Sequence, residues 1–333
     1  MLEHSKIEVK NINSIKVAVV IPCYRVKRFI LNVIGSIGPE VSIIYVIDDR
    51  CSENSGKYVL ENCSDKRVQV LFHEQNMGVG AAMITGYTRA IQDGASIIVK
   101  IDGDGQMDTK LIPMFINPIV NGLADYTKGN RFYDLELVHS MPVKRLVGNA
   151  VLSFMTKLSS GYWDLFDPTN GFTAIHANVA SHLPFKKISN RYFFETDMLF
   201  RLNILRAVVR DIPMKAYYGE EVSNLRISRI IGEFLIKHLR NFLKRIFYNY
   251  YLRDMSVASL ELPIGLALLF FGMLFGGLSW ISSATQEVAT PLGTIMISAV
   301  SILSGLQLVL AFLSFDMNST PRLPLQKILY PRE

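Results

Sequence analysis

Two carboxylates and an amide follow one another at alternate positions, directly after an apolar run. Asp102, Asp104 and Gln106 come after residues 96–99, which predict a buried strand. In an extended segment, side chains at positions i, i+2 and i+4 point the same way, so these three would present oxygens to one hard cation. The segment therefore predicts an Mg²⁺ or Mn²⁺ site with coordination positions left for substrate phosphates. The alternative interpretation is a solvated Asp/Gly turn.

The elements that would position this segment alternate regularly over residues 16–128. The predicted strands are 16–21, 41–47, 68–72, 96–101 and 124–128, and the predicted helices are 26–36, 55–62, 79–93 and 109–121. Continuous apolar strands between helices are typical of an α/β fold with a mostly parallel sheet covered on both faces. Such sheets bind ligands at the carboxyl ends of their strands. Three clusters fall there and predict one site: Pro22-Cys23-Tyr24, Asp48-Asp49-Arg50 and the Asp102 segment.

Beyond residue 142 the pattern is less regular. Helices are predicted near 143–159 and 195–206, with a turn at 167–171. From 225 to 251 the chain is basic, and its apolar residues recur at helical spacing, which predicts an interfacial helix or helix pair that binds anionic headgroups. A nucleic-acid face is the competing interpretation of a basic helix. The apolar stripe is too heavy for that, so no nucleic-acid partner is expected.

Two long uncharged segments lie near the carboxyl end of the 333 residues. Residues 262–281 and 288–315 are each long enough to cross a hydrocarbon core of about 30 Å. Gly272 and Gly276 have the spacing of close helix contacts in lipid. The chain therefore predicts a two-helix membrane hairpin, with spans near 262–281 and 290–315, rather than two buried helices of a soluble domain. Such glycines also permit packing between protomers, so a homo-oligomer is compatible with the pattern.

The charges that flank the spans predict the orientation of the hairpin. Lys and Arg are frequent in 226–253 and 322–332, and the connecting loop 282–290 has none. By the positive-inside rule both termini face the cytoplasm, and polar residues 1–16 show no signal peptide. The three cysteines (Cys23, Cys51 and Cys63) lack metal-type spacing and are expected to be free thiols.

These observations divide the chain into four parts. The predicted boundaries are a cytoplasmic α/β domain over 1–222, amphipathic juxtamembrane helices over 223–258, two transmembrane helices over 259–318, and a cytoplasmic tail over 319–333. The α/β domain alone is long enough for a substantial core.

Two further motifs are weaker signals when each is taken alone. Gly78-Val79-Gly80 lacks the third glycine of a dinucleotide-binding turn, because position 83 is Met, and its spacing indicates a tight turn with close packing. The pair Asp48-Asp49 would accept hydrogen bonds from a ribose or a base, or would cap a helix N-terminus.

Taken together, four segments resemble a known family. They occur in the order found in family 2 glycosyltransferases of the GT-A fold: Val19-Val20-Ile21-Pro22-Cys23-Tyr24, Val46-Ile47-Asp48-Asp49-Arg50-Cys51-Ser52, Asn76-Met77-Gly78-Val79-Gly80 and Asp102-Gly103-Asp104-Gly105-Gln106. The closer resemblance, over about 16–215, is to dolichol-phosphate mannose synthases and bacterial polyprenyl-phosphate glycosyltransferases. The two-span tail is similar to that of the membrane-anchored bacterial members. The resemblance implies a GT-A, Rossmann-like sheet.

The resemblance also implies roles for the clustered residues. It assigns the nucleotide to Pro22, Tyr24, Asp48, Asp49, Asp102 and Gly103. It assigns the metal that grips the sugar-nucleotide diphosphate to Asp102, Asp104 and Gln106. The implied pocket for the sugar and the acceptor includes Asn170, Gly171 and Glu195.

Two arginines match the family's phosphate-binding positions. Arg131, in Gly129-Asn130-Arg131-Phe132, and Arg145 are implied to hold the acceptor phosphate, and Asn149 stands where the family has a serine. Independently of the resemblance, guanidinium forks suit a phosphate acceptor better than a neutral one. The family's basic segment further on is replaced by residues 219–226, with Arg226 as the candidate to restore the positive charge.

Glu195 and Asp197 leave two acceptors open. Other family 2 enzymes carry such carboxylates, one of which acts as general base on an acceptor hydroxyl, whereas a lipid phosphate is already ionised and needs no base. A structural role in helix capping or arginine orientation is the alternative. The sequence thus predicts an inverting hexosyltransferase that moves a sugar from a UDP- or GDP-linked donor to polyprenyl phosphate. The second hypothesis is a sugar-hydroxyl acceptor with Asp197 as base, and the third is a non-catalytic membrane scaffold that binds nucleotide sugars.

Overall fold

The computed structural model describes residues 15–133, 143–167, 170–214 and 227–329, with the side chains of 143–145 and 227–231 left out. The chain forms two compact units. The first comprises Met1–Asn241 together with Pro321–Glu333, and the second is Phe242–Thr320. The second unit is therefore an insertion in the sequence of the first, and the chain segments before and after it both belong to the first unit.

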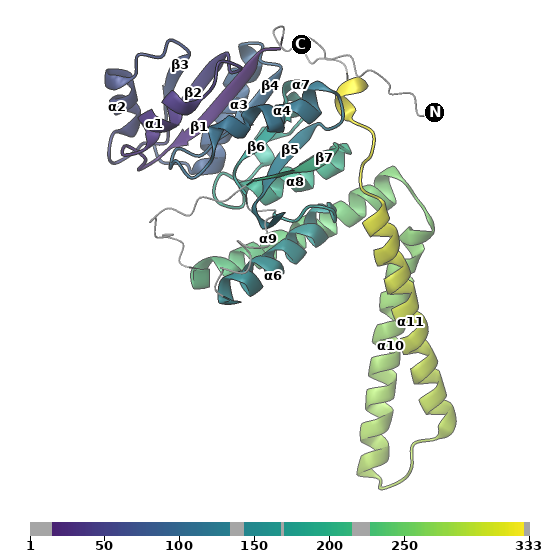
Figure 1. The fold of residues 1–333 in the computed structure, drawn as a ribbon. Helices are drawn as coiled ribbons and strands as arrows, with labels where there is room; N and C mark the ends of the chain where they lie inside the picture. Colours follow the sequence, from purple (N-terminus) through teal and green to yellow (C-terminus); the bar gives the residue numbers. More distant parts are fainter. Residues whose placement is uncertain (1–14, 134–142, 168–169, 215–226, 330–333) are drawn as a thin grey trace. The chain divides into compact units, whose positions relative to one another are not determined.

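A seven-stranded sheet is the centre of the first unit (Figure 1). Its strand order is β3-β2-β1-β4-β6-β5-β7, and only β6 runs antiparallel to its neighbours. The strands are β1 (Val17–Cys23), β2 (Ile43–Asp48), β3 (Val68–Phe72), β4 (Ile97–Lys100), β5 (Tyr126–Asn130), β6 (Thr173–His176) and β7 (Val209–Pro213).

Helices cover both faces of this sheet, as predicted. Along β1, Val17, Val19 and Ile21 face one core, while Ala18 and Val20 face the other, because successive side chains of a strand alternate. The first core is closed by α1 (Ile30–Ser36), α2 (Ser55–Asn62) and α4 (Ile112–Val120), which follows the 3-10 turn η2 (Thr109–Leu111). The second is closed by α3 (Val79–Gln92), α7 (Ala177–Ser181) and α8 (Phe194–Leu205).

Two longer helices add to the first unit beside α8. They are α6 (Val143–Ser160) and the first part of α9 (Ile227–Phe247). The Ser159 hydroxyl lies 2.8 Å from His238 Nδ1, and Phe193 meets Phe234 edge to face at 5.3 Å. The first contact joins α6 to α9, and the second joins α9 to the start of α8.

The carboxyl-terminal segment also packs on the first unit. Both oxygens of the buried Asp125 carboxylate accept backbone N–H groups of η6 (Leu325–Lys327): Leu325 N at 2.8 Å and Gln326 N at 2.9 Å. The Leu325 side chain joins the hydrophobic core formed with α3, α7 and α8. Residues 325–327, which the sequence analysis places in a separate tail, therefore pack on the first unit.

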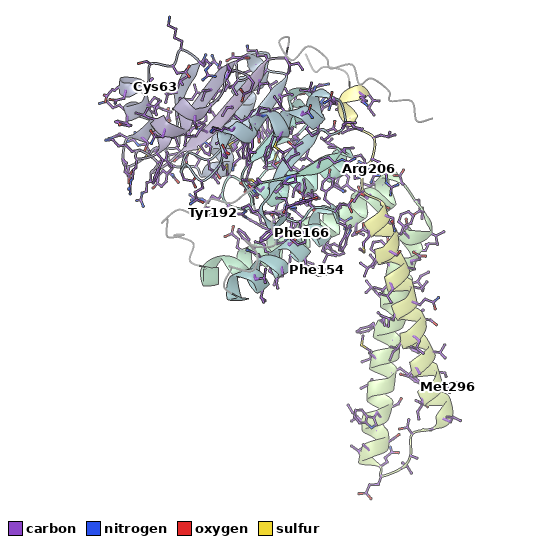
Figure 2. The ribbon with its side chains drawn as sticks, viewed as in Figure 1. Cys63, Phe154, Phe166, Tyr192, Arg206 and Met296 are labelled. Atoms are coloured by element: carbon purple, nitrogen blue, oxygen red, sulfur yellow. The ribbon has the colours of Figure 1, made fainter. Side chains whose placement is uncertain are left out.

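The second unit is a helical hairpin. After η5 (Tyr248–Arg253), α10 (Val257–Thr285) and α11 (Leu292–Asn318) are both long and apolar enough to cross a membrane. The helices approach closely at Gly272, whose carbonyl accepts the Ser298 hydroxyl at 2.8 Å. Figure 2 shows side chains standing outward along both helices, among them Met296, which is 55% exposed. Two long helices with an apolar exterior of this kind suggest a membrane protein.

A buried ion pair closes the base of the hairpin. Arg245 binds Asp316 with two N–H groups, at 2.5 and 2.9 Å, and the Tyr250 hydroxyl adds a third hydrogen bond at 2.6 Å. The three residues are between 1% and 4% exposed, so the charges are compensated by contact with one another rather than by water.

Most of the predicted elements are present, and two strands were not predicted. β6 and β7 lie in the region that showed no clear period. β6 has only four residues, and β7 contains Arg210 and Asp211. The remaining 3-10 segments are η3 (Arg131–Tyr133) and η4 (Phe185–Lys187).

Candidate active site

Most predicted site residues meet at one edge of the sheet. The parallel strands β1, β2, β4 and β5 end there, and antiparallel β6 begins there, next to β4 and β5. Residues that follow Cys23, Asp48, Lys100 and Asn130 therefore gather with those that precede Thr173. This is the edge where open parallel sheets bind ligands.

The Asp48 and Asp49 carboxylates are both buried and hold loops. Asp48 accepts hydrogen bonds from Cys51 N and from Gly56 N in the first turn of α2, each at 2.7 Å. Asp49 accepts from Met77 N at 2.8 Å and from Gly78 N at 2.7 Å. The helix-capping role that was left open for this pair is thus present for Asp48.

The glycine motif at the start of α3 makes the close approach that its spacing indicated. Gly78 has φ +100°, and a Cβ there would lie 2.6 Å from the carbonyl oxygen of Asn190. Only glycine adopts this conformation without strain at so short a contact. The motif therefore packs α3 against the loop that leads into α8.

An exposed aromatic side chain lies beside the first two strand ends. Tyr24 is 42% exposed, and the Arg25 guanidinium lies 5.3 Å from its ring centroid. Arg25 N donates to Cys51 Sγ at 3.1 Å, which ties this turn to the residues after Asp49. Pro22 lies in β1 itself, paired with Ile47. Cys23, Cys51 and Cys63 are free thiols, as expected.

The segment after β4 is a turn, so the predicted extended geometry is wrong. Strand pairing stops at Lys100, Gly105 has φ +77°, and the Asp104 carboxylate accepts Gln106 N at 3.0 Å. Asp and Gly favour such turns because the Asp side chain binds the backbone two residues on. Asp102, Asp104 and Gln106 are partly exposed in this turn, and Gly103 is buried. The three side chains therefore do not alternate along a strand, and strand geometry gives no reason for them to bind one metal ion together.

A buried lysine that the sequence analysis did not select organises the first of these carboxylates. Lys100 Nζ donates to Asp102 Oδ1 at 2.8 Å and to the Gly171 carbonyl at 3.1 Å, and it lies 3.4 Å from Glu195 Oε1. Burial alone lowers the pKa of Lys100, but attraction by Asp102 and Glu195 outweighs it and raises the pKa above its ordinary value.

Gly171 is required by this arrangement. A Cβ at that position would lie 2.4 Å from Asp102 Oδ2 and 2.5 Å from Lys100 Nζ. The backbone before β6 thus comes into direct contact with the Asp102–Lys100 pair. Asn170, beside it, is buried, and its Oδ1 accepts Phe172 N at 2.9 Å, which fixes the turn.

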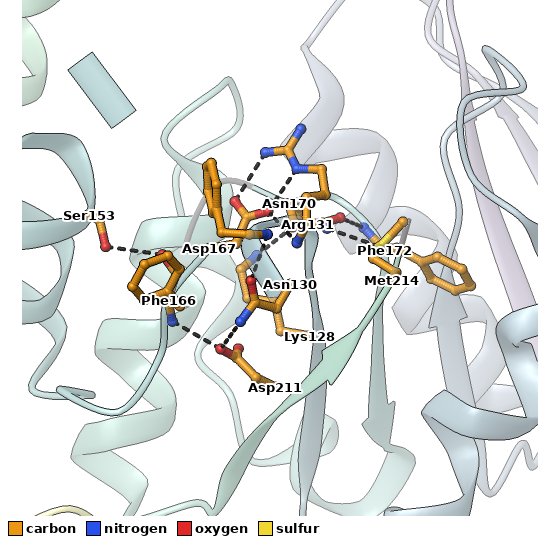
Figure 3. Close-up of polar contacts among 11 residues, drawn as sticks. Lys128, Asn130, Arg131, Ser153, Phe166, Asp167, Asn170, Phe172, Asp211 and Met214 are labelled. Atoms are coloured by element: carbon orange, nitrogen blue, oxygen red, sulfur yellow. Dashed lines mark hydrogen bonds and ion pairs between the residues drawn. The ribbon is translucent and has the colours of Figure 1, made fainter. Parts of the chain in front are cut away.

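Arg131 is held by a carboxylate 36 residues away (Figure 3). Its Nε and Nη2 donate to the two oxygens of Asp167, at 2.7 and 3.0 Å. Asp167 is fully buried, whereas 26% of the Arg131 side chain is accessible. A bidentate pair fixes the plane of the guanidinium. The arginine predicted to bind phosphate is thus pre-oriented at the end of β5.

A second buried lysine supports the same corner. Lys128 Nζ donates to the Asn170 carbonyl, and burial lowers the pKa of Lys128 to about 8. Nearby, Asp211 in β7 accepts from Asn130 Nδ2 at 3.1 Å and from Phe166 N at 2.9 Å, and burial raises the pKa of Asp211 to about 6 (Figure 3). The ends of β5 and β7 and the loop before β6 are thereby joined.

The remaining phosphate candidates lie on α6. Asn149 is half-buried there. Arg145 belongs to the first turn of the helix, with its side chain outside the described part, so its role in holding the acceptor phosphate stays a prediction. Residues 168–169 and 219–226, including Arg226, also lie outside the described residues.

Glu195 and Asp197 point to different neighbours. Glu195 faces Lys100, as described above. Asp197 Oδ2 accepts Ser189 N at 2.9 Å, its Oδ1 accepts Asn241 Nδ2 at 3.2 Å, and Arg201 lies 3.7 Å away. Residues two apart on a helix face nearly opposite directions. Glu195 therefore belongs to the sheet-edge cluster, and Asp197 makes the structural contacts of the alternative interpretation.

The sheet domain is similar in sequence to known proteins. The model of the family "Glycosyl transferase family 2" matches residues 18–183. The UDP-N-acetylglucosamine–dolichyl-phosphate N-acetylglucosaminyltransferase of Methanococcus voltae is 30% identical over 215 residues, which are 60% of this chain and 85% of that protein. The chain belongs to glycosyl transferase family 2.

Other family members point to the same kind of enzyme. The undecaprenyl-phosphate mannosyltransferase of Micrococcus luteus is 24% identical over 230 residues, which are 68% of this chain and 93% of that protein. The polyprenol monophosphomannose synthase of Mycolicibacterium smegmatis is 25% identical over 189 residues, which are 55% of this chain and 70% of that protein. This family 2 protein is therefore a glycosyltransferase of the hexosyltransferase class.

Solved structures confirm the fold. The glucosyl-3-phosphoglycerate synthase of Mycobacterium tuberculosis, in complex with Mn²⁺, UDP-glucose and phosphoglyceric acid, has a TM-score of 0.52. It covers 70% of this chain and 80% of its own, at 17% identity. This likeness shows the predicted GT-A fold.

Proposed function

We propose that this protein transfers a hexose from a UDP- or GDP-linked donor to polyprenyl phosphate at the cytoplasmic face of a membrane. The observation that carries the proposal is the Arg131–Asp167 pair, a guanidinium with its plane fixed at the ligand-binding edge of the sheet. Relatives named for dolichyl-phosphate and undecaprenyl-phosphate transfer support this acceptor.

The turn after β4 fits a hard divalent cation. Asp102 and Asp104 offer carboxylates within three residues, and Gln106 adds an amide oxygen, which is the type of ligand set that hard cations use. Among the described residues no three His, Cys, Asp or Glu side chains form a complete metal site, so donor phosphates would complete the coordination. Mg²⁺ or Mn²⁺, when bound, neutralises charge on the leaving diphosphate.

The chain's own residues then position the acceptor. Arg131, together with Arg145, holds the phosphate so that one of its oxygens attacks the anomeric carbon in line. The bond from that carbon to the diphosphate oxygen breaks, and the nucleoside diphosphate leaves with the electron pair. Inversion gives a β-linked lipid-phosphate sugar. No general base is needed because the phosphate is ionised.

Two helices of the catalytic unit support a membrane-facing surface. On α9 the polar His238 and Asn241 are buried, whereas Leu235, Ile236 and Leu239 are 55–69% exposed. α6 likewise exposes apolar side chains at helical spacing: Val147, Val151 and Phe154, the last labelled in Figure 2. An outward apolar stripe suits the headgroup region of a lipid bilayer better than water.

The return of the chain supports the proposed topology. Residues on both sides of the hairpin belong to the first unit, so an even number of crossings connects them. Because Lys and Arg flank the outer ends of the spans, that side would be cytoplasmic.

The alternative acceptor is a sugar hydroxyl of a lipid-linked glycan, with Asp197 as general base. Both carboxylate oxygens of Asp197 already accept hydrogen bonds, one from Ser189 N and one from Asn241 Nδ2. This structural role does not suit a general base, so it favours the phosphate acceptor.

Asp104→Ala tests the metal assignment. Transfer of label from nucleotide sugar to undecaprenyl phosphate, measured with Mn²⁺, should be lost, while the variant inserts and unfolds thermally like the wild type. Near-normal transfer by a folded Asp104→Ala variant would remove the metal turn from the proposal. Asp108→Ala, in the cap of η2 outside the proposed turn, is the matched control.

A further inference from the structure

The ammonium of Lys100 lies between Asp102 of the proposed metal turn and Gly171 and Glu195 of the proposed sugar pocket. Lys100 is 1% exposed, and its Nζ contacts two acidic side chains that come from different parts of the chain: Asp102 at 2.8 Å and Glu195 at 3.4 Å. Its third contact is the Gly171 carbonyl at 3.1 Å. All three are oxygen atoms, so the ammonium fills a place lined by the same ligand type that a hard divalent cation uses.

The surroundings explain why a charge is tolerated there. Lys100 ends β4 between β1 and β6, where a neutral side chain would be expected in a buried strand. A buried ammonium is stable only when paired, and the two carboxylates supply that pairing. Conversely, without Lys100 the Asp102 and Glu195 charges would face one another without a cation between them.

We propose that Lys100 is a positioning residue that competes with the catalytic metal for Asp102, so that the metal binds together with the donor diphosphate rather than alone. This inference rests on the proposed function, since it takes Asp102 as a metal ligand. It assigns Lys100 a role in the order of binding, which the metal turn alone does not imply.

The reasoning is electrostatic. A divalent cation that approaches Asp102 meets an ammonium held 2.8 Å from one of its ligand oxygens, and like charges at such distances repel strongly. A nucleoside diphosphate adds negative charge and further oxygen ligands, which offset this repulsion. Metal and nucleotide therefore bind with positive coupling, and the coupling is reciprocal.

Lys100→Met tests the competition with a side chain of similar length and no charge. Mn²⁺ binding to the purified full-length protein in detergent is measured by electron paramagnetic resonance, alone and with UDP or GDP. We expect the variant to bind Mn²⁺ alone at least about tenfold more tightly than the wild type. The gain in Mn²⁺ affinity that the nucleotide produces should shrink correspondingly. A site that was merely disrupted would bind Mn²⁺ more weakly instead.

A double variant separates release of Asp102 from a change in net charge. Lys100→Met with Glu195→Gln removes one charge of each sign and leaves no unpaired carboxylate pair, so it also serves if the single variant does not fold. Its affinity for Mn²⁺ alone should still exceed that of the wild type. Lys57→Met, at a 69% exposed side chain on α2, is the control for general charge and should leave Mn²⁺ binding unchanged.

The outcomes distinguish this inference from the proposed function. If the wild-type protein transfers sugar but both Lys100 variants bind Mn²⁺ no more tightly than the wild type, the proposed role of Lys100 is wrong. The proposed function is not affected by that result. A wild-type protein that binds no Mn²⁺ with either nucleotide and transfers no sugar overturns both.

Discussion

The carboxylates of Glu195 and Asp197, two residues apart at the start of α8, lie in separate environments. Glu195 is 3.4 Å from the Lys100 ammonium, whereas Asp197 accepts a backbone N–H from Ser189 at 2.9 Å. The helix turns one towards the sheet edge and the other towards α9. The acidic motif therefore combines one site residue, Glu195, with one residue that stabilises the fold, Asp197. Because the hydroxyl-acceptor hypothesis needs Asp197 as general base, substitutions of Asp197 distinguish the two possible acceptors.

Asp197→Asn should reduce stability more than catalysis. The amide cannot accept at both of its former oxygens, so a hydrogen bond to Ser189 N or Asn241 is lost, at a cost of about 1–3 kcal/mol. Thermal unfolding and label transfer at a temperature where the variant is folded measure the two effects. Transfer within about tenfold of wild type is expected for a phosphate acceptor, because general base catalysis contributes typically 10²–10⁴-fold. A loss of several orders would instead support the hydroxyl acceptor.

Asp167→Asn should impair the acceptor side of the reaction. Without the second anionic oxygen the Arg131 guanidinium loses its fixed plane, and misplacement of a positioning group by about 1 Å costs on the order of 100-fold in rate. The measurement is kcat/KM for polyprenyl phosphate, compared with the KM for the donor, which should change little. Asp65→Asn breaks a similar but more accessible pair with Arg67 and should leave transfer intact. Equal effects of the two substitutions would argue against an acceptor role for Arg131.

How far the sequence predicts the site depends on the range of the contacts. The first five strands and their helices follow from apolar runs and turns, and they bring Asp48, Asp49 and Asp102 to one edge. The partner of Arg131 is 36 residues away, across a region without a clear period, so no local pattern connects it to Asp167. Such a pair becomes visible only when the sheet order is known.

The lysines illustrate a signal that was present and not used. Lys100 ends the otherwise apolar strand β4, and Lys128 ends the predicted strand 124–128, so each places a charge where burial is expected. A charge in a buried strand needs a partner, and that requirement points to a site. The error over the Asp102 segment has a different origin: strand periodicity was extended through two glycines, which instead form a turn.

Acid should destabilise the catalytic unit through His238. Burial lowers the pKa of His238 to about 4, whereas the unfolded chain has an ordinary pKa of 6.5. The folded form thus keeps the ring neutral, and its stability is complete above pH 6.5 and falls as the pH drops towards 4, by on the order of 2 kcal/mol. The fall in unfolding temperature between pH 7 and pH 5 should be smaller in His238→Gln. Parallel curves for the two proteins would contradict this assignment.

Asp125→Ala should release the carboxyl-terminal segment. The carboxylate, itself fully buried, accepts Val208 N, Leu325 N and Gln326 N within 2.9 Å, so its loss leaves three N–H groups without this acceptor. We expect a destabilisation of about 3 kcal/mol and faster tryptic cleavage after Lys327. Glu61→Ala, at an exposed side chain, is the control. Wild-type cleavage and unfolding of Asp125→Ala would show that the segment is held by other contacts.

The most direct test of the central claim compares acceptors that differ only in the phosphate. Purified protein with Mn²⁺ and a panel of radiolabelled UDP- and GDP-sugars is offered polyprenyl phosphate, the corresponding polyprenol, or a lipid-linked glycan. The account predicts label in a lipid product that mild acid hydrolyses, formed from polyprenyl phosphate alone and abolished by EDTA. Label on the glycan or the polyprenol, in an acid-stable product and with polyprenyl phosphate inactive, would contradict it.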